Sequence, residues 1–249
     1  MKIFIELGNT CLKLATLVSD RYQFVGLIKH HNDENQIMDL LTNEGLEDVS
    51  NVYVCSVASA GLNATLTQCI QQTFQVYPAF LTTQPESCGI VCGYDSFQNL
   101  GVDRWMAIVG GCAHSSQPTI IVDAGTALTI DMVIDKQHQG GFIVPGLGLM
   151  KQSLIDHTAI SANIDQQLEL EETGLLAKNT SHAIQGGTLF MIGAFLNSLL
   201  DNLESETGRR FRCIGTGGDF DTLNPMLDKH FEVIHDLTLL GMVEMVQSH

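Results

Sequence analysis

Apolar and polar residues follow two alternating patterns along the chain. Short apolar runs separated by Gly-Asn and Ser-Asp-Arg turns predict an antiparallel meander of strands at residues 2–5, 12–18 and 22–29. Helical spacing of apolar residues follows at residues 36–47 and 62–74, with a buried strand expected at residues 52–57 between them. A helix is predicted at residues 101–113, after a segment at residues 82–99 without a clear period, which we interpret as a loop over a site. The first part of the chain is therefore predicted to be α/β.

The same order recurs after polar turn residues at positions 114–118. A second meander is expected from residue 119 to about 144, with strands at 119–122 and 128–134 and a turn at Asp135-Lys136. Later, helices are predicted at 148–157, 181–204 and 237–247, with strands at 210–214 and 231–234. This repetition predicts two α/β domains, residues 1–114 and 115–249.

Composition narrows the class of protein. The 249 residues are 45% hydrophobic and contain no uninterrupted apolar run long enough for a membrane span, which indicates a globular chain. A formal charge of −16 repels nucleic acid and anionic membranes, so we expect neither as a partner. Seven scattered cysteines and no visible export signal favour reduced thiols in the cytoplasm. The neighbouring His30 and His31 are interpreted as exposed.

Two segments far apart share one design. In Glu6-Leu-Gly-Asn-Thr10, the first loop, and Asp123-Ala-Gly-Thr126, the second loop, a carboxylate precedes glycine by two residues and an amide or hydroxyl residue follows. Bare backbone can then approach an anion beside a metal-binding oxygen. Either segment alone could be an ordinary β-turn. Their recurrence favours the binding of nucleotide phosphates, with bound cations and backbone N–H groups supplying the charge that this acidic chain lacks.

Three further segments contain candidate chemistry. Asp103 and Arg104 fall at the start of a predicted helix, where a carboxylate is stabilised and a guanidinium can orient an anionic substrate. The alternative is a helix cap beside a surface ion pair. Residues 140–146 form a turn rich in glycine and proline, and residues 215–219 form a Gly-Thr-Gly-Gly-Asp turn that could admit a nucleoside. For the turn at residues 140–146 the alternative is a purely structural corner, and for the turn at residues 215–219 it is an ordinary Gly-Gly turn without a ligand.

Taken in order, these five segments resemble those of the type III pantothenate kinases. The segments are E-L-G-N-T-C-L-K, Y-D-S-F-Q-N-L-G-V-D-R-W, I-V-D-A-G-T-A-L-T-I-D, G-G-F-I-V-P-G-L-G-L-M and T-G-G-D. The resemblance covers residues 3 to about 242. It implies an α/β fold of two related actin-like (ribonuclease H-like) ATPase domains with an ATP cleft between them. The implied reaction is ATP-dependent phosphorylation of pantothenate to 4'-phosphopantothenate, the first step of coenzyme A biosynthesis.

The resemblance also implies a role for individual residues. Asp103 corresponds to the general base. Pantothenate-binding positions correspond to Tyr94, Gly101 and Arg104, and to His157 and Thr180 contributed by the partner subunit of a homodimer. ATP-binding positions correspond to Glu6, Gly8, Asn9, Thr10, Lys13, Gly125, Thr126, Thr129, Gly217 and Gly218. Asp123 corresponds to the ligand of a monovalent cation, K⁺ or NH₄⁺, and Glu6 to a carboxylate that binds the Mg²⁺ of ATP directly or through water.

One position departs from the family pattern, because Glu6 stands where Asp is usual. The extra methylene displaces the carboxylate by about one bond length, which can disturb a preorganised Mg²⁺ site. Two alternatives to an active pantothenate kinase follow: a catalytically impaired pantothenate-binding or regulatory protein, and a kinase for another small hydroxylated substrate. Glycines at 186, 187 and 193 within the predicted helix at 181–204 favour close helix packing, so we expect this helix at the dimer contact.

Overall fold

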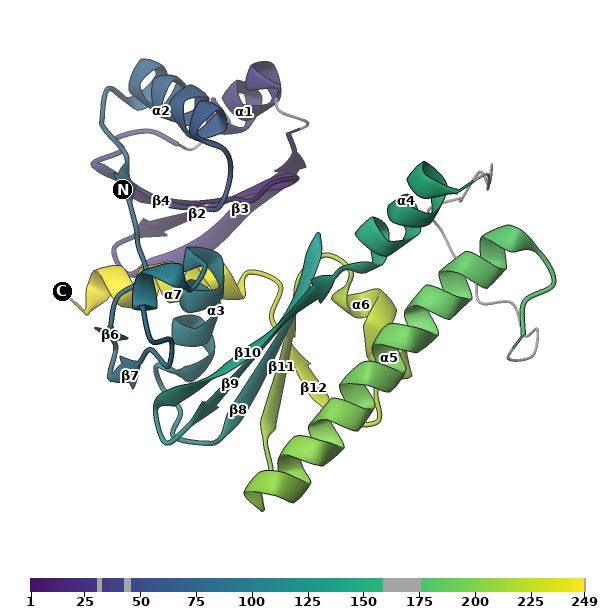
Figure 1. The fold of residues 1–249 in the computed structure, drawn as a ribbon. Helices are drawn as coiled ribbons and strands as arrows, with labels where there is room; N and C mark the ends of the chain where they lie inside the picture. Colours follow the sequence, from purple (N-terminus) through teal and green to yellow (C-terminus); the bar gives the residue numbers. More distant parts are fainter. Residues whose placement is uncertain (31–32, 43–45, 159–175, 249) are drawn as a thin grey trace. The chain divides into compact units, whose positions relative to one another are not determined.

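The computed structural model describes residues 1–30, 33–42, 46–158 and 176–248 (Figure 1). Contacts divide the chain into two compact units. Unit 1 contains Met1–Gln117, Asp131–Gly140 and Asp236–His249, and unit 2 contains Pro118–Ile130 and Gly141–His235. Each is described by itself below. The two domains predicted at residues 1–114 and 115–249 stay a prediction.

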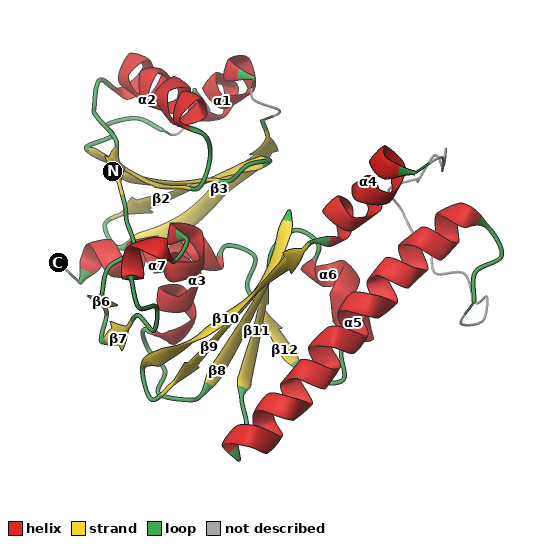
Figure 2. Cartoon of the chain, viewed as in Figure 1, coloured by secondary structure: helices red, strands yellow, loops and turns green. Residues whose placement is uncertain are grey.

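Unit 1 is built on a sheet with strand order β3-β2-β1-β4-β5. Its strands are β1 (Lys2–Leu7), β2 (Cys11–Val18), β3 (Arg21–Lys29), β4 (Asn51–Ser56) and β5 (Ala79–Phe80). The pairs β1–β2 and β2–β3 are antiparallel, which confirms the first predicted meander, and β4 runs parallel to β1. Since side chains alternate along a strand, Ile3, Ile5 and Leu7 enter one core with α1 (Glu34–Leu41) and α2 (Ala60–Phe74) (Figure 2).

The opposite face of this sheet carries Phe4 and Glu6 and is contacted by α3 (Val102–Cys112) and α7 (Leu237–Gln247). These two helices meet backbone to backbone, because a Cβ at Gly241 would lie 1.8 Å from the carbonyl oxygen of Met106, and one at Gly110 would lie 2.4 Å from that of Leu237. Only glycine allows this approach. Helix α7 therefore packs directly against the backbone of α3 and supports it.

A second sheet has the order β12-β11-β8-β9-β10-β7-β6. Its strands are β6 (Glu86–Ser87), β7 (Ile90–Val91), β8 (Thr119–Ala124), β9 (Ala127–Ile134), β10 (Gln137–Pro145), β11 (Arg212–Thr216) and β12 (Phe231–Val233). In unit 2, β11 runs parallel to both β8 and β12. The turn between β9 and β10 has Asp135 and Lys136 at φ 51° and 63°, as expected for a tight hairpin, and its tip belongs to unit 1.

Helices α4 (Leu147–His157), α5 (Thr180–Thr207) and α6 (Phe220–Leu223) complete unit 2, with a 3₁₀ turn at Asn224–Met226. Asn179 caps α5 by accepting a hydrogen bond from the backbone N–H of His182, and Gly208 ends it in a left-handed conformation. Phe195 of α5 meets Phe142 of β10 edge to face. By length and composition α5 could cross a membrane, but a single such helix is weak evidence, because core helices pass the same test.

Three local predictions differ from the structure. The segment predicted as a loop at residues 82–99 contains the short pair β6–β7 and a 3₁₀ turn at Phe97–Asn99, because a two-residue strand leaves no periodic signal. The helix expected to continue to residue 47 ends at Leu41, within the part that the structure describes. The short helix α6 was not predicted.

Candidate active site

Asp103 occupies the first turn of α3, where backbone N–H groups are free to stabilise a carboxylate. Its Oδ1 accepts a hydrogen bond from the backbone N–H of Arg104 at 2.8 Å. Gly101 begins the helix without a side chain, and a Cβ there would lie 2.6 Å from the same oxygen. Burial raises the pKa of Asp103 above its usual value, although the N–H and the charge of Arg104 act in the opposite direction. This carboxylate is consequently a stronger base than an exposed aspartate.

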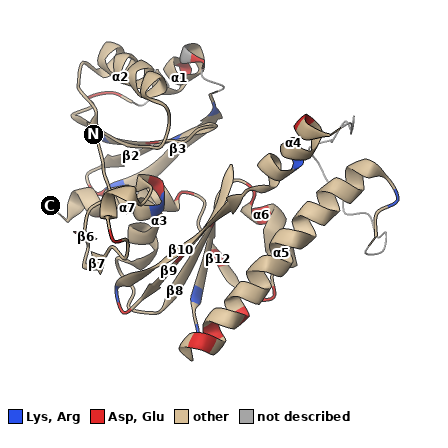
Figure 3. Cartoon of the chain, in the orientation of Figure 1, with Lys and Arg blue, Asp and Glu red and all other residues tan. Residues whose placement is uncertain are grey.

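Arg104, the next residue, is held by a buried network and is only 6% exposed. Its Nε and Nη2 donate to the two carboxylate oxygens of Asp131 at 2.9 and 2.6 Å, and its Nη1 donates to the Tyr94 hydroxyl at 2.8 Å. Burial acts to lower the pKa of Arg104, but the hydrogen bonds and charge of Asp131 outweigh it and the pKa rises. An acidic and a basic residue, coloured red and blue in Figure 3, are thus adjacent at the start of α3.

The first loop connects β1 to β2. Glu6 and Lys13 stand opposite each other in the β1–β2 register, and the Lys13 Nζ lies 3.0 Å from the Glu6 Oε2 in a largely buried ion pair. Asn9 and Thr10 are exposed at the tip, and the N–H of Gly8 donates to the Cys11 carbonyl. The Glu6–Lys13 ion pair and the exposed residues Asn9 and Thr10 therefore lie at the same turn.

His30 holds this loop from β3, and the expectation that it is exposed was wrong. Its side chain is fully buried, its Nε2 lies 3.1 Å from the carbonyl oxygen of Gly8, and its backbone N–H donates to the carbonyl of Thr10. Because a carbonyl only accepts, Nε2 must carry the proton. A lone histidine at the end of a strand gave no sequence signal for this contact. The neighbouring His31 lies outside the described residues.

Glu6 and Asp103 lie near a common buried group. The Cys55 thiol is directly beside Glu6 in the β1–β4 register, and its pKa is raised by burial and then by the charges of Glu6 and Asp103. Tyr22 donates to the Asp236 carboxylate at 2.5 Å, and burial, Asp236 and Glu6 raise its pKa in turn. Unit 1 therefore brings the carboxylates of the first loop and of α3 into one neighbourhood.

The second loop, in unit 2, depends on close backbone contacts that only glycine allows. A Cβ at Gly146 would lie 2.1 Å from the Gly125 carbonyl oxygen, and one at Gly217 would lie 2.5 Å from both the Ala124 backbone and the Asp123 Oδ1. Gly217 also adopts φ +92°. The structure thus brings Asp123, Gly125 and Thr126 together with Gly217, and Gly218 follows at the surface; Thr129 lies on the adjoining strand β9.

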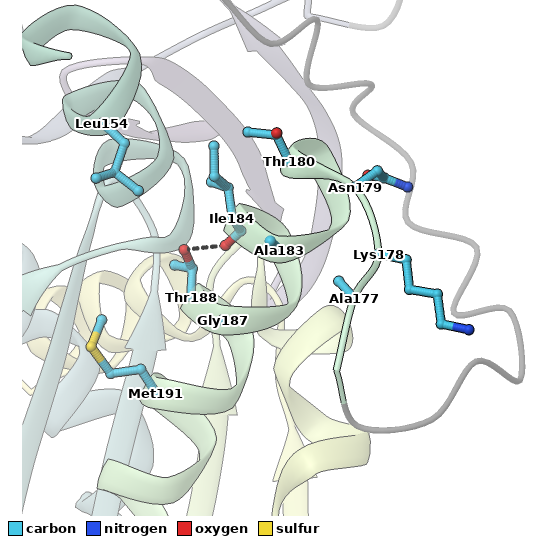
Figure 4. Close-up of a pocket in the computed structure, with 10 residues that line it drawn as sticks. All are labelled: Leu154, Ala177, Lys178, Asn179, Thr180, Ala183, Ile184, Gly187, Thr188 and Met191. Carbon is cyan, nitrogen blue, oxygen red and sulfur yellow. Dashed lines mark hydrogen bonds between the residues drawn. The ribbon is translucent and has the colours of Figure 1, made fainter. Parts of the chain in front are cut away.

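His157 and Thr180 are exposed at the end of α4 and the start of α5. Both belong to unit 2. Thr180 lines a hollow of about 700 Å³ whose wall is mainly apolar (Figure 4). Leu154 reaches it from α4, Met191 from α5, and the Thr188 hydroxyl is turned back onto the Ile184 carbonyl at 2.7 Å.

The described residues contain no cluster of three or more His, Cys, Asp or Glu side chains suited to hold a metal. Mg²⁺ does not need one, since it is commonly bound through one or two carboxylates, water and substrate phosphates. The ion-paired oxygen of Glu6 and the loop oxygens around Asp123 are hard donors of the kind that Mg²⁺ and K⁺ prefer. The residues present are compatible with cations that arrive with a nucleotide.

Comparison with known proteins decides the family. The model of the type III pantothenate kinase family matches residues 2–202. The chain belongs to the type III pantothenate kinase family. A type III pantothenate kinase of Hydrogenovibrio crunogenus is 55% identical over the full length of both chains.

Two solved structures share the fold. A conserved Baf family protein from Campylobacter jejuni has a TM-score of 0.60 at 20% identity, covering 98% of this chain and 97% of its own. The ethanolamine utilization protein EutJ from Carboxydothermus hydrogenoformans has a TM-score of 0.52 at 14% identity, with coverage of 98% and 89%. The predicted actin-like α/β fold is confirmed.

Membership of the type III pantothenate kinases also confirms the predicted reaction. The chain is an enzyme that phosphorylates pantothenate with ATP, in the first step of coenzyme A biosynthesis. The family result favours this activity over the regulatory protein and the kinase for another substrate.

Proposed function

We propose that Asp103 is the general base of pantothenate phosphorylation. The observation that carries this proposal is the half-buried carboxylate with a raised pKa at the start of α3, beside an arginine whose Nε and Nη2 donate to Asp131. In the step, the primary hydroxyl oxygen bonds to the γ-phosphorus of ATP, the bond from that phosphorus to the β–γ bridging oxygen breaks, and Asp103 takes the hydroxyl proton. ADP leaves. Such a base assists late, because phosphoryl transfer depends mainly on positioning and charge.

Arg104, Tyr94 and Gly101 are the proposed pantothenate-binding residues of the same subunit. Pantothenate is a carboxylate, and a guanidinium is suited to recognise one. The described hydrogen bonds engage three of the five N–H groups of Arg104, and the remaining two are on Nη1 and Nη2. These two N–H groups are the proposed contacts for the substrate.

The two loops are the proposed ATP phosphate sites. Glu6, Gly8, Asn9, Thr10 and Lys13 form the first; Asp123, Gly125, Thr126 and Thr129 form the second, and Gly217 and Gly218 are the proposed contacts for the nucleoside of ATP. Backbone N–H groups in such turns bind phosphate oxygens. When bound at Glu6 and Asp123, Mg²⁺ and a monovalent cation such as K⁺ or NH₄⁺ supply positive charge to the phosphates. Since Lys13 is paired with Glu6, the lysine also holds that carboxylate in place before ATP arrives.

A second copy of the chain is the proposed partner for the exposed apolar face of unit 2. Ile143 is 61% exposed on β10, and Phe190 and Met191 are 51% and 53% exposed on α5. Met191 and Leu154 also line the mainly apolar hollow beside Thr180, and exposed apolar surface of this kind favours an interface. His157 and Thr180 adjoin this region at the ends of α4 and α5, which supports their contribution to a partner's pantothenate pocket. The seven free cysteines agree with a cytoplasmic location.

ADP release is the first measurement. The purified protein receives ATP and Mg²⁺, with and without pantothenate, in potassium and then in sodium buffer. We expect release that requires pantothenate and is faster in potassium. Equal rates in the two buffers would remove the monovalent cation from the proposal, and release without pantothenate would contradict a base that serves this substrate.

Asp103→Asn tests whether the carboxylate acts as a base, because it removes the charge and keeps the shape of the side chain. Because the shape is retained, pantothenate affinity should stay within about threefold while kcat falls by at least about 100-fold. The raised pKa means that the folded state prefers the neutral acid, a contribution to stability that is present at low pH and lost as pH rises through the folded pKa. The neutral amide should therefore melt no lower than the parent at pH 7. In the parent, the acid limb of kcat/KM should lie above the ordinary aspartate pKa.

Met191→Glu tests the dimer. A charge on the apolar face should dissociate the dimer and lower activity in parallel, as measured by sedimentation and by ADP release over a dilution series. Tyr77→Glu is a matched control, because Tyr77 is 83% exposed and belongs to unit 1. A fully active monomeric Met191→Glu variant would contradict a shared pocket.

A further inference from the structure

His138 is a buried histidine that the proposed reaction does not use. It lies on β10 and is 1% exposed, and its Nε2 is 2.9 Å from the Asp131 Oδ1. On the other side of the ring, the backbone N–H of Gly93 donates to Nδ1 at 3.4 Å. Because Nδ1 acts as an acceptor, the hydrogen-bond pattern assigns the proton to Nε2, which then donates to Asp131.

The contacts of His138 converge on the two residues that hold Arg104. The Asp131 Oδ1 accepts from both His138 and the Nη2 of Arg104, while the Asp131 Oδ2 accepts from the Nε. The His138 ring also stacks on Tyr94, with ring centroids 5.9 Å apart and planes at 15°. Tyr94 in turn accepts from the Nη1 of Arg104. His138 thereby restrains both partners of the guanidinium without touching it in any described contact.

The hairpin tip that carries Asp131 and His138 is fastened to both ends of α3. At the start of the helix, Asp131 binds Arg104 through two parallel hydrogen bonds, which fix the plane of the guanidinium. At its end, the Lys136 Nζ donates to the carbonyl oxygens of Cys112 and Ala113 at 2.5 and 2.7 Å. Cations are favourable at that end of a helix. The tip thus braces the helix that presents Asp103 and Arg104.

We propose that His138, acting through Asp131 and Tyr94, is a positioning residue that sets the orientation of Arg104 and hence the affinity of the enzyme for the carboxylate of pantothenate. This inference rests on the proposed role of Arg104. Without the His138 donor, Asp131 retains an unfilled acceptor and one fewer restraint. The guanidinium plane then varies, and its two remaining N–H groups no longer meet the substrate in one geometry.

His138→Phe and His138→Gln are the paired test. Phenylalanine keeps a ring against Tyr94 and removes the N–H to Asp131, whereas the glutamine amide can still donate. We expect His138→Phe to raise the KM for pantothenate about tenfold, with kcat and the KM for ATP changed less than about twofold, and His138→Gln to restore most of the affinity. Titration calorimetry with pantothenate should show the same loss and rescue. His114→Phe, which replaces a histidine whose side chain is 80% exposed, is the matched control.

Three results would overturn the inference: an unchanged pantothenate KM in His138→Phe, an equal rise in the KM for ATP, or no rescue by glutamine. If the Phe variant does not fold, Asp131→Asn tests the same link, and an unchanged pantothenate KM there also overturns it. Arg104→Lys distinguishes the proposed role of Arg104 in binding pantothenate from the proposed role of His138 in positioning Arg104. If this change leaves pantothenate affinity intact, the proposed role of Arg104 fails; if it weakens binding while His138→Phe does not, only the role of His138 fails.

Discussion

Side chains help to hold the first loop, at residues 6–10, whereas the contacts described for the second, at residues 123–126, come from the backbone of neighbouring glycine turns. The first loop receives a hydrogen bond from the His30 side chain and contains the Lys13–Glu6 ion pair, in addition to backbone hydrogen bonds from His30 to Thr10 and from Gly8 to Cys11. In the second loop, the N–H of Gly146 donates to the Thr126 carbonyl and that of Asp219 donates to the Ala124 carbonyl. The same pattern of carboxylate, glycine and polar residue is thus stabilised by different kinds of contact in the two loops.

This difference affects how each loop responds to substitution. A loop held by side chains loses one interaction at a time, and a similar side chain can replace it. A loop held by close backbone contacts tolerates substitution less well, because a Cβ added at a contacting glycine would displace the main chain. We therefore expect graded effects on ATP use from changes around the first loop and abrupt loss of function from changes around the second.

The largest effect is expected from Gly146→Ala. Its Cβ would lie 2.1 Å from the Gly125 carbonyl oxygen and 2.7 Å from that of Thr126, so the second loop must move. We expect a loss of at least about 2 kcal/mol in the free energy of unfolding and a fall of more than about tenfold in kcat/KM for ATP. Denaturant unfolding and steady-state kinetics measure these quantities.

Gly148→Ala is the matched control, because nothing lies within 4 Å of a Cβ at that position. It should change the free energy of unfolding by less than about 0.5 kcal/mol. If the two alanine variants behave alike, the second loop is not held by backbone contact and the comparison fails.

An intermediate effect is expected from His30→Phe. The change leaves the part-buried carbonyl of Gly8 without this donor, which should cost about 1 kcal/mol in the free energy of unfolding and raise the KM for ATP several-fold. The KM for pantothenate should not change. His30→Gln can donate in place of the imidazole and should recover part of both losses. A rise in both Michaelis constants would show that His30 supports the unit in general rather than the loop.

The smallest effect is expected from Glu6→Asp. Shortening the side chain lengthens the pair with Lys13 but restores the residue that is usual in the family, so the KM for ATP should fall or kcat should rise, by less than about fivefold. Mg²⁺ titration of the initial rate adds a second readout. Loss of turnover together with weaker ATP binding would show that the site is adapted to glutamate.

Sequence patterns predicted the elements of this fold well and its long-range contacts poorly. The periods of residues 12–18 and 62–74 identified β2 and α2, because local spacing determines which face of an element is buried. His30 was misread because its burial depends on a loop that folds back over it. The pairing of Arg104 with Asp131 joins positions 27 residues apart on different elements, so neither the motif nor the period could predict it. The candidate residues came from ordered motifs, and their supporting residues only from the structure.

The glycine contact between α3 and α7 affects the order in which the enzyme can mature. Residues 102–112, which include Asp103, leave the ribosome before the whole of unit 2, while the helix against which they pack is made afterwards. Gly241 lies directly on the Met106 carbonyl, so this contact can form only once residues 237–247 have been made. The nascent chain can therefore fold its first sheet early, but the helix that carries Asp103 meets this packing partner only after the whole of unit 2 has been made.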